Sequence, residues 1–449
     1  MLDGMKKQIV RRILFPLQEK VKGHNTHYVL HELEQSQWLN TANFEARQQK
    51  RLNEFLSHAV KESAYYQNVF NSLGLTVNDI KSAKDIARLP FLDKAIIREH
   101  TEQIATRPLN ELSVNRTGGS SGEPLVFYTS NERTSHDIAA RMRANRWFGV
   151  DVGSKELVVW GAPHELNSQD RIKLLRDNLF RSKLISAFNM NDTDLKAKLV
   201  DIQNYQPEMI FAYPSAIYNI ANYCQTHNIR LDVPHLKAIF VTSEMLFEDQ
   251  RNVIERVFSA PVVNEYGGRD GGFIARECPE GNFHINADDI IVEIVDEAGN
   301  TVSEGESGEV VVTHLQSFGF PFIRYKMGDV ASISHEKCAC GRNLPVIKHL
   351  EGRLNDFLIG ADNRKVHPNV ANYIIRLNAN ITQYKVVQSA NKQVEVFVVA
   401  KLKLDEAAKR KIISDFTDRL EDVGITITQV DNIAPEKSGK RRYIISNVE

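Results

Sequence analysis

Short apolar runs along the chain alternate with segments of helical periodicity. From about residue 110 to 315 the β-rich runs are ELVVWG, EMIFAY, AIFVTS, PVVNEY, IIVEIV and EVVVTH. Between them lie segments with apolar residues at helical spacing, such as FEDQRNVIERVF at 247–258. Short strands that alternate with helices are typical of an α/β protein with a sizeable sheet. We predict that class for the larger part of the chain.

The two ends of the chain have apolar patterns that differ from the pattern of the middle part. The first 75 residues are expected to be helical, because apolar positions recur on one helix face: Leu52, Phe55, Leu56, Ala59 and Val60. After Gly352 follow strand-like YKVVQ and VEVFVVAKL, helix-like LDEAAKRKIISDFTDRL and strand-like GITITQV. We predict a large domain at 1–352, with a helical lead-in at 1–75, and a small mobile α+β domain at 353–449.

Length and charge narrow the function classes. At 449 residues the chain exceeds what one core usually organises. Its 56 basic and 57 acidic residues nearly cancel, so no global field favours nucleic acid. No apolar run approaches the roughly 20 residues of a membrane helix, and the opening lacks a signal-peptide pattern. We expect a cytoplasmic protein without a nucleic-acid partner or a transmembrane segment.

The stretch from Lys6 to Val21 is basic and amphipathic. Such a helix can lie on a membrane surface, but a face rich in lysine and arginine is more commonly just solvated. The sequence alone therefore favours a solvated helix here.

A loop rich in glycine and hydroxyl groups spans Asn115–Leu125 and precedes the strand-like LVFYT. Glycine lets backbone N–H groups approach phosphate oxygens, because no side chain blocks them. The G-x-x-x-x-G-K-[ST] pattern of P-loop kinases and GTPases is missing. Taken alone, such a loop is more commonly an ordinary turn.

Four downstream segments change that interpretation: NEYGGRD at 264–270, RYKMGD at 324–329, GRLND at 352–356 and PEKSGKRR at 435–442. With TGGSSGEP at 117–124, they resemble, in order and spacing, the motifs of the adenylate-forming superfamily. That superfamily contains acyl-CoA ligases, luciferases and peptide-synthetase adenylation domains. The resemblance implies ATP-dependent activation of a small-molecule carboxylic acid as its acyl-AMP.

The resemblance also implies roles for single residues. Lys440 would be the adenylation lysine and Asp270 the carboxylate that helps to hold Mg²⁺, while Asn355 and Asp356 would form the hinge. The remaining matched positions would bind the nucleotide: Thr117, Gly118, Gly119, Ser120, Ser121, Gly122, Glu265, Tyr266, Gly267, Asp329 and Arg353. In this scheme the Tyr266 ring lies by the adenine, and Asp329 accepts hydrogen bonds from the ribose hydroxyls.

The matching segments place the acyl pocket at Trp160, His164, Tyr213, Ser215, Gly268 and Arg269. Aromatic side chains suit a planar acid or ordinary core packing, so the sequence does not name the acid. Arg269 stands where the superfamily has Ser or Thr, and could pair with the α-phosphate, with a second substrate carboxylate or within the fold. Glu123 replaces a common lysine and Asp270 replaces a Glu, which motivates a noncatalytic nucleotide-binding relative as one alternative.

Within the superfamily, SQWLN and AVKESAYYQNVF resemble the phenylacetate–coenzyme A ligase branch, and most of all its CapK-type proteins associated with capsular polysaccharide biosynthesis. A second branch feature is one imidazole and three thiols: Cys278, His284, Cys338 and Cys340. This set closes a tetrahedral structural Zn²⁺ site. Its C-x-C and C-x₅-H spacings differ from the common C-x₂-C finger, so ordinary cysteines and histidine are the alternative. Cys224 is expected in the core.

Two catalytic outcomes remain open. Transfer of the acyl group to coenzyme A is the leading prediction, and transfer to an amine, a hydroxyl or a carrier is the alternative. Lys440, Asp329 and Arg353 argue against a noncatalytic protein. The cofactors implied are ATP, Mg²⁺ and structural Zn²⁺, and the oligomeric state stays open, with a homodimer as one option.

Overall fold

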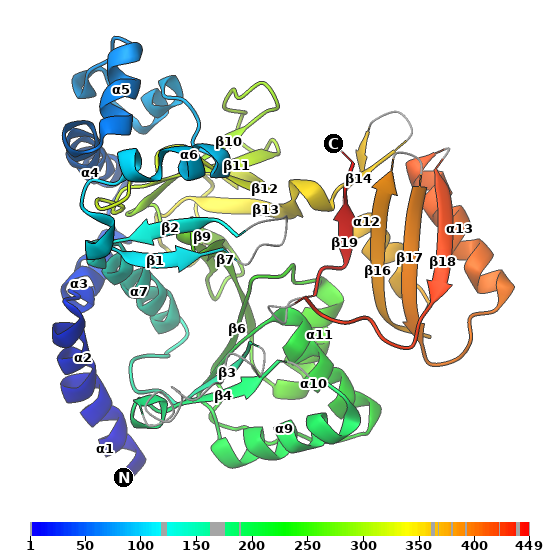
Figure 1. Cartoon of the computed structure of the whole chain (residues 1–449). Helices are drawn as coiled ribbons and strands as arrows, with labels where there is room; N and C mark the ends of the chain where they lie inside the picture. Colours follow the sequence, from blue (N-terminus) through cyan, green and yellow to red (C-terminus); the bar gives the residue numbers. More distant parts are fainter. Residues whose placement is uncertain are drawn as a thin grey trace. The chain divides into compact units, whose positions relative to one another are not determined.

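The computed structural model divides the chain into two compact units, Met1–Met327 with Ser332–Lys348, and Gly328–Ala331 with His349–Glu449 (Figure 1). We call them unit 1 and unit 2. The structure describes residues 2–117, 124–161, 176–187, 190–360, 364–366, 368–378, 380–390, 393–421, 423–436 and 441–448.

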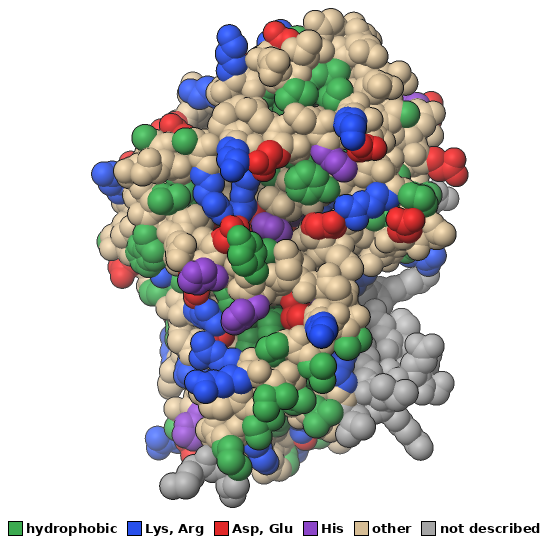
Figure 2. All heavy atoms as spheres, turned by 90° about the vertical axis from the view of Figure 1, so that its left-hand side faces the viewer, with side chains coloured by type: hydrophobic (Ala, Val, Ile, Leu, Met, Phe, Trp, Pro, Cys, Tyr) green, Lys and Arg blue, Asp and Glu red, His purple; other side chains and the backbone are tan. Residues whose placement is uncertain are grey.

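The beginning of unit 1 is helical. Its elements are α1 (Leu2–Ile9), the π-helical segment η1 (Val10–Leu14), α2 (Phe15–Lys22), α3 (Thr26–Ser36), α4 (Thr41–Glu62) and α5 (Ala64–Ser72). Gly23, with φ of 67°, ends α2 in the left-handed conformation that glycine adopts without strain. The Asn40 side chain caps α4 by accepting from the Asn43 N–H. Figure 2 shows the face of the molecule on which α1 and α2 lie.

Of the expected apolar face of α4, Leu52, Phe55, Leu56 and Ala59 are buried and Val60 is half-buried. In chain order, α5 is followed by short helices, a two-stranded antiparallel ribbon and one long helix before the first strand of the main sheet. These elements are η2 (Val77–Asp79), η3 (Ala83–Arg88), α6 (Lys94–Ile104), η4 (Leu109–Glu111), β1 (Ser113–Arg116), β2 (Val126–Thr129) and α7 (Asn131–Arg146).

The main sheet has the strand order β10-β11-β12-β13-β9-β8-β7-β6-β5-β3-β4. Its strands are β3 (Glu156–Trp160), β4 (Ser182–Ser186), β5 (Met209–Ala212), β6 (Ala238–Thr242), β7 (Val262–Gly268), β8 (Gly272–Glu277), β9 (Phe283–Ile285), β10 (Ile290–Val295), β11 (Gly308–His314), β12 (Tyr325–Ser334) and β13 (Val346–Arg353). The β-rich runs expected from sequence correspond to β3, β5, β6, β7, β10 and β11. The predicted α/β class is confirmed.

One part of the sheet, from β4 to β7, is parallel, and apolar side chains bury both of its faces. Ile239 and Val241 of β6 share a core with α9 (Asp192–Tyr205), α10 (Pro214–Thr226) and α11 (Glu248–Phe258). Phe240 points to the other face and packs with Met209 and Val263. Burial on both faces explains why these strands are continuous apolar runs. At β7 and β8 the pairing becomes antiparallel.

Unit 1 also contains an ionic core. Asp288 and Asp289 have fully buried side chains. Asp288 accepts a hydrogen bond from Arg143 of α7 at 2.9 Å, and Asp289 accepts from Arg51 of α4 and from His136 of α7 at 2.8 Å each. The two carboxylates therefore link α4 and α7 to the segment before β10.

Unit 2 is a small α+β fold with its own core. Its elements are η6 (Leu354–Asp356), β14 (Leu358–Ile359), β15 (Lys365–Val366), α12 (Pro368–Arg376), β16 (Ile381–Ala390), β17 (Gln393–Ala400), α13 (Glu406–Leu420), β18 (Gly424–Gln429) and β19 (Ile444–Ser446). The sheet order is β18-β17-β16-β19, with only β16 and β17 antiparallel among these pairs. Phe416 of α13 packs with Val386 and Val396 of the sheet.

Candidate functional site

A tight hairpin between β7 and β8 carries the segment that the sequence singles out for nucleotide and metal binding. Tyr266 is buried in β7, and Arg269, Asp270 and Gly271 form the turn. A side chain on Gly267 would collide with the carbonyl oxygen of Gly272 across the hairpin. Glycine at 267 therefore lets the two strands approach closely at the base of the turn.

Two buried side chains hold Asp270 in place. The Tyr325 hydroxyl donates to Asp270 Oδ2 at 2.8 Å. Arg133 of α7, only 1% exposed, donates to the carbonyl oxygens of Arg269 and Asp270. The carboxylate and its backbone are thus both fixed, which is what a pre-organised cation ligand requires.

A second pair, Asp137 and His314, supports the other side of the turn. Asp137 Oδ1 accepts from the Phe273 N–H at 2.8 Å and lies 3.4 Å from His314 Nε2. Burial raises the pKa of Asp137, but His314 and Arg133 outweigh it and hold the pKa at about 2. Gly272, with φ of 83°, leaves no room for a side chain, since a Cβ would come within 2.8 Å of both groups.

None of these supporting residues was predicted from the sequence. Tyr325 lies inside the quoted RYKMGD segment, which was a usable signal for it. Arg133, Asp137 and His314 lie outside every motif, and only the tertiary structure brings them to the hairpin.

The Glu265 side chain forms ion pairs with two arginines of the fold. It is buried, and its carboxylate pairs with Arg141 at 2.8 Å and with Arg276. Burial raises its pKa, but the two guanidinium groups outweigh that effect and lower it. The expected nucleotide contact of Glu265 stays a prediction, since the described bonds of this carboxylate are to arginines.

Arg269 connects the hairpin to the base of the glycine-rich loop. Its guanidinium donates to the Arg116 carbonyl at 3.2 Å. Next to it, Thr117 closes the loop base: its N–H donates to the Leu125 carbonyl, and its hydroxyl accepts from the Leu125 N–H. The loop residues 118–123, which include Gly118, Gly119, Ser120, Ser121 and Gly122, lie outside the described residues. The structure therefore brings the turn of Asp270 and the loop's entrance together.

The expected acyl-pocket residues lie in two places. Trp160 stacks on Tyr213 with ring centroids 3.9 Å apart, and Tyr213 is buried. Ser215 is buried at the start of α10, where its N–H donates to Glu244. Gly268 and Arg269 belong to the hairpin, and His164 lies outside the described residues. The aromatic pair packs with the core between the sheet and α10, and its role toward a substrate stays a prediction.

Unit 2 brings together the ribose-binding and hinge candidates. Arg353 Nε lies 3.8 Å from Asp329 Oδ1. Asp356 in η6 pairs with Arg442 at 2.5 Å. Burial raises the pKa of Asp356, and Arg442 opposes that rise. Asn355 belongs to the same short helix, and its side chain is not among those described.

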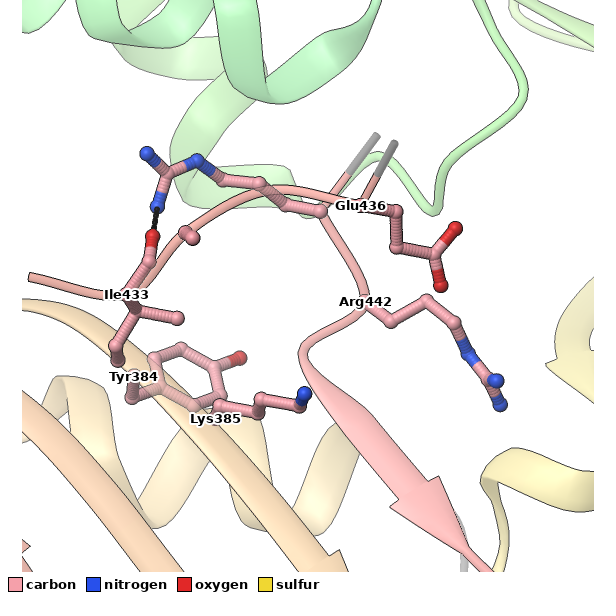
Figure 3. A pocket seen from close by; sticks show the side chains of 7 residues that line it. Tyr384, Lys385, Ile433, Glu436 and Arg442 are labelled. Carbon is pink, nitrogen blue, oxygen red and sulfur yellow. Dashed lines mark hydrogen bonds between the residues drawn. The ribbon is translucent and has the colours of Figure 1, made fainter. Parts of the chain in front are cut away.

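A small pocket in unit 2 adjoins the PEKSGKRR segment. It is lined by Tyr384, Lys385, Ile433, Ala434, Glu436, Arg441 and Arg442 (Figure 3). Arg441 donates to Gln383 of β16 at 2.7 Å and to the Ile433 carbonyl, just before the segment, at 3.3 Å. Lys440 lies in 437–440, outside the described residues, and its catalytic role stays a prediction.

The imidazole and the three thiols meet in unit 1. The ligand atoms of Cys278, His284, Cys338 and Cys340 all lie within 4.8 Å of one another. His284 Nε2 is 3.2 Å from Cys340 Sγ, and its Nδ1 is 3.0 Å from the Leu344 carbonyl. Burial lowers the pKa of His284 to about 4, so the ring is neutral at pH 7. A neutral ring that donates from Nδ1 leaves the Nε2 lone pair for a metal.

The chain is similar in sequence to known proteins over most of its length. Residues 358–447 match the family described as the CapK C-terminal domain. Protein CapK of Staphylococcus aureus is 29% identical over 432 residues, 94% of each chain. A phenylacetate–coenzyme A ligase of Pseudomonas putida is 24% identical over 421 residues, 87% of this chain and 91% of the relative.

A solved structure shows the same fold. It is that of 2-hydroxyisobutyryl-CoA ligase in the postadenylation state with R3-HIB-AMP, which matches 91% of both chains with a TM-score of 0.74 at 18% identity. The chain is therefore similar in sequence to CapK and to the phenylacetate–coenzyme A ligases along most of its length, and it has the fold of an adenylate-forming CoA ligase.

Proposed function

We propose that the chain is an AMP-forming acid ligase that activates a carboxylic acid with ATP and then passes the acyl group to coenzyme A. The observation that carries this proposal is the hairpin turn: Asp270 is fixed by Tyr325 and Arg133 beside the entrance of the glycine-rich loop. Similarity to phenylacetate–coenzyme A ligases supports the thiol as acceptor.

The reaction has two halves with different charge requirements. In the first, the substrate carboxylate attacks the α-phosphorus of ATP and pyrophosphate leaves. In the second, the acceptor thiol attacks the acyl carbon of the mixed anhydride, and AMP leaves with the bond electrons. Both halves need developing negative charge to be neutralised by groups placed in advance.

The residues of the chain would share this work. Asp270 would hold Mg²⁺, since its carboxylate is anchored through Tyr325 and keeps further lone pairs for a cation. The ion supplies positive charge at the phosphate oxygens when it is bound. Asp329 would accept from the ribose hydroxyls, and Lys440 would neutralise the α-phosphate during the first half.

A panel of acids tests both halves. The protein is incubated with ATP, Mg²⁺ and each acid, pyrophosphate release is followed, and coenzyme A or amines are then added. We expect acid-dependent pyrophosphate formation and a thioester only with coenzyme A. Pyrophosphate exchange without a thioester, but with an amide, would instead establish the amine-acceptor alternative. No nucleotide turnover with any acid would support the noncatalytic alternative.

Lys440→Ala tests the adenylation role. The substitution should lower acid-dependent pyrophosphate release by at least about a hundredfold, because one preorganised charge is lost, while ATP binding measured by calorimetry changes little. Lys411→Ala, an exposed lysine of α13 in the same unit, is the matched control. Normal adenylation by the Lys440 variant would remove the proposed mechanism.

We also propose that Cys278, His284, Cys338 and Cys340 hold a structural zinc ion. A tetrahedral ion with Zn–S bonds of about 2.3 Å places its sulfurs about 3.8 Å apart, and the Cys278 and Cys338 sulfurs lie 3.6 Å apart. Asn282 Nδ2 and the Cys340 N–H approach Cys338 Sγ at 3.2 and 3.4 Å, as donors that stabilise a thiolate. Four protein donors leave no position for substrate, so the role would be structural.

Metal analysis of the purified chain tests this site. About one equivalent of zinc is expected, and Cys338→Ser should lose it together with thermal stability, because the metal contributes folding energy. Cys224→Ser is the matched control, since Cys224 is buried in α10 apart from the cluster. Less than about half an equivalent in the wild type would count against the site.

A further inference from the structure

The first helices of unit 1 expose a continuous apolar stripe. It consists of Met5, Ile9, Ile13, Leu17 and Val21, at four-residue intervals along α1, η1 and α2. Ile13 and Leu17 are each 58% exposed and Val21 is 80% exposed. Exposed apolar residues are ordinary when they are scattered singly, whereas an aligned row marks a surface that binds something.

The other side of this helix is fixed to the protein through polar contacts. Lys7 Nζ donates to Glu208 at 2.7 Å, and Arg181 pairs with Asp3 at 2.7 Å. Glu19 is buried and accepts from the Thr26 N–H at 3.1 Å. A surface helix ordinarily turns its apolar stripe to the core and its charges to water. Here several charged groups face inward and the apolar stripe faces outward.

The π-helical segment η1 keeps the stripe straight. Positions four apart drift steadily around an α-helix of 3.6 residues per turn. A π-helix, with its i→i+5 hydrogen bonds, has more residues per turn, so its rotation per residue is smaller. Along α1 the four-residue stripe rotates gradually around the helix axis. Because Val10–Leu14 is π-helical, this rotation is reversed before α2 begins. The apolar residues therefore stay on one side over the whole length.

The charges beside the stripe are basic. Residues 2–22 include six lysines and arginines and two acidic residues, Asp3 and Glu19, both of which are paired or buried within the fold. Lys6, Arg12, Lys20 and Lys22 are exposed. Figure 2 shows hydrophobic side chains gathered on the lower part of this face, with lysine and arginine side chains beside them.

We propose that this face, α1 to α2, lies on the surface of an anionic lipid bilayer, with the stripe in the interfacial region and the basic residues near the headgroups. Exposed apolar residues flanked by cations are the combination that holds an interfacial helix. Among the described residues no helix has the length and apolarity to cross a bilayer, so the contact is superficial. A second copy of the chain is a poorer occupant, since pairing two such faces brings like charges together.

Vesicle flotation of the full chain tests the proposal. The lipids are phosphatidylcholine alone, or phosphatidylcholine with about a third phosphatidylglycerol. We expect flotation only with the anionic vesicles, and release as NaCl rises from about 0.1 M to about 0.5 M. The double variant Ile13→Ser/Leu17→Ser should partition at least about tenfold less. Val200→Ser/Leu402→Ser, which alters exposed apolar residues outside the stripe, should behave as the wild type.

The double variant Arg12→Gln/Lys20→Gln measures how much the basic residues contribute to vesicle binding apart from the apolar stripe. It should weaken flotation at low salt more than at high salt. The proposal is overturned if anionic vesicles do not retain the wild type, or if the stripe variant floats equally well. It is also overturned if light scattering shows a wild-type dimer that the stripe variant lacks. Acid-dependent pyrophosphate release should be equal in all these variants, which keeps this test independent of the proposed reaction.

Discussion

Three arginine side chains, Arg133, Arg143 and Arg276, lie almost wholly inside unit 1, with 2% exposure or less. Each is matched by specific acceptors: Arg133 by the carbonyls of the hairpin turn, Arg143 by Asp288, and Arg276 by Glu265. A buried charge without partners is very costly, so such groups fix the geometry around them. In this protein Arg133 and Arg276 fix the segment that carries Asp270, and Arg143 fixes the segment of Asp288 before β10.

At the same scale, Tyr325→Phe should weaken the use of magnesium without removing activity. The substitution deletes the hydroxyl that donates to Asp270 Oδ2 at 2.8 Å. Hydrogen bonds to charged groups contribute about 1.5–3 kcal/mol, so the magnesium concentration for half-maximal pyrophosphate release should rise about tenfold or more. Titration of Mg²⁺ at saturating ATP and acid measures this.

Tyr66→Phe is the matched control for that titration. Tyr66 is buried and donates to the Pro321 carbonyl at 3.2 Å, away from Asp270. Like Tyr325→Phe, the Tyr66→Phe variant loses one hydroxyl hydrogen bond in unit 1, but it should leave the magnesium requirement unchanged. Equal magnesium curves for Tyr325→Phe and the wild type would show that the hydroxyl does not position the carboxylate.

At the scale of elements, the apolar pattern was a good guide to strands and a poor guide to polar contacts. Strands such as β6 are buried on both faces, so their sequences contain little besides apolar residues, and the prediction succeeded. Helix α7 is rich in arginine and polar residues, and no periodicity shows that Arg133 and Arg143 turn inward. The sequence also favoured solvated basic residues on α1 and α2, and did not show that the apolar face points outward.

The docking of α1 gives a pH-dependent prediction. Burial raises the pKa of Glu208, but the hydrogen bond from Lys7 and nearby cations outweigh it and hold the pKa at about 2, below the ordinary 4.5. The carboxylate therefore stabilises the fold above pH 4.5, and this contribution is lost as the pH falls from 4.5 toward 2. Glu208→Gln should lower the Tm at pH 7, and its difference from the wild type should shrink in acid.

Thermal unfolding from pH 7 down to about pH 3 checks this, with Asp201→Asn as the control. Asp201 makes a half-exposed ion pair with Lys183 at 2.7 Å, and exposed pairs contribute only about 0–1 kcal/mol. A Tm difference for Glu208→Gln that grows in acid would contradict the assignment.

At the scale of the whole molecule, the two units have separate hydrophobic cores. Ile412→Ala in α13 and Ile220→Ala in α10 should each cost about 2–5 kcal/mol, because each deletes buried methyl groups and leaves a cavity. We expect calorimetry to show two transitions, with Ile412→Ala lowering one and Ile220→Ala lowering the other. If both variants shift a single transition, the units unfold together.

The sequence motifs point to candidate residues because the chemistry of a site needs particular residue types, and these stand in a few short segments. The roles of Asp270, Asp329 and Arg353 stay predictions, while the structure brings the side chains of the four metal-ligand candidates together. The supports of the hairpin come from α7, β11 and β12, which are far apart in the sequence. Tyr325 of β12 stands within the RYKMGD segment, whereas Arg133, Asp137 and His314 lie outside the motifs, and only the tertiary fold shows their contacts with the hairpin.

The ionic core has a consequence for how the chain can be divided. Arg51, in α4 of the helical lead-in, pairs with the buried carboxylate of Asp289 in the interior of unit 1. Truncation before residue 75 would leave that buried carboxylate short of a cation and expose the surface that α4 covers. The first helices are therefore integral to the domain, and a shortened chain should accumulate as insoluble protein.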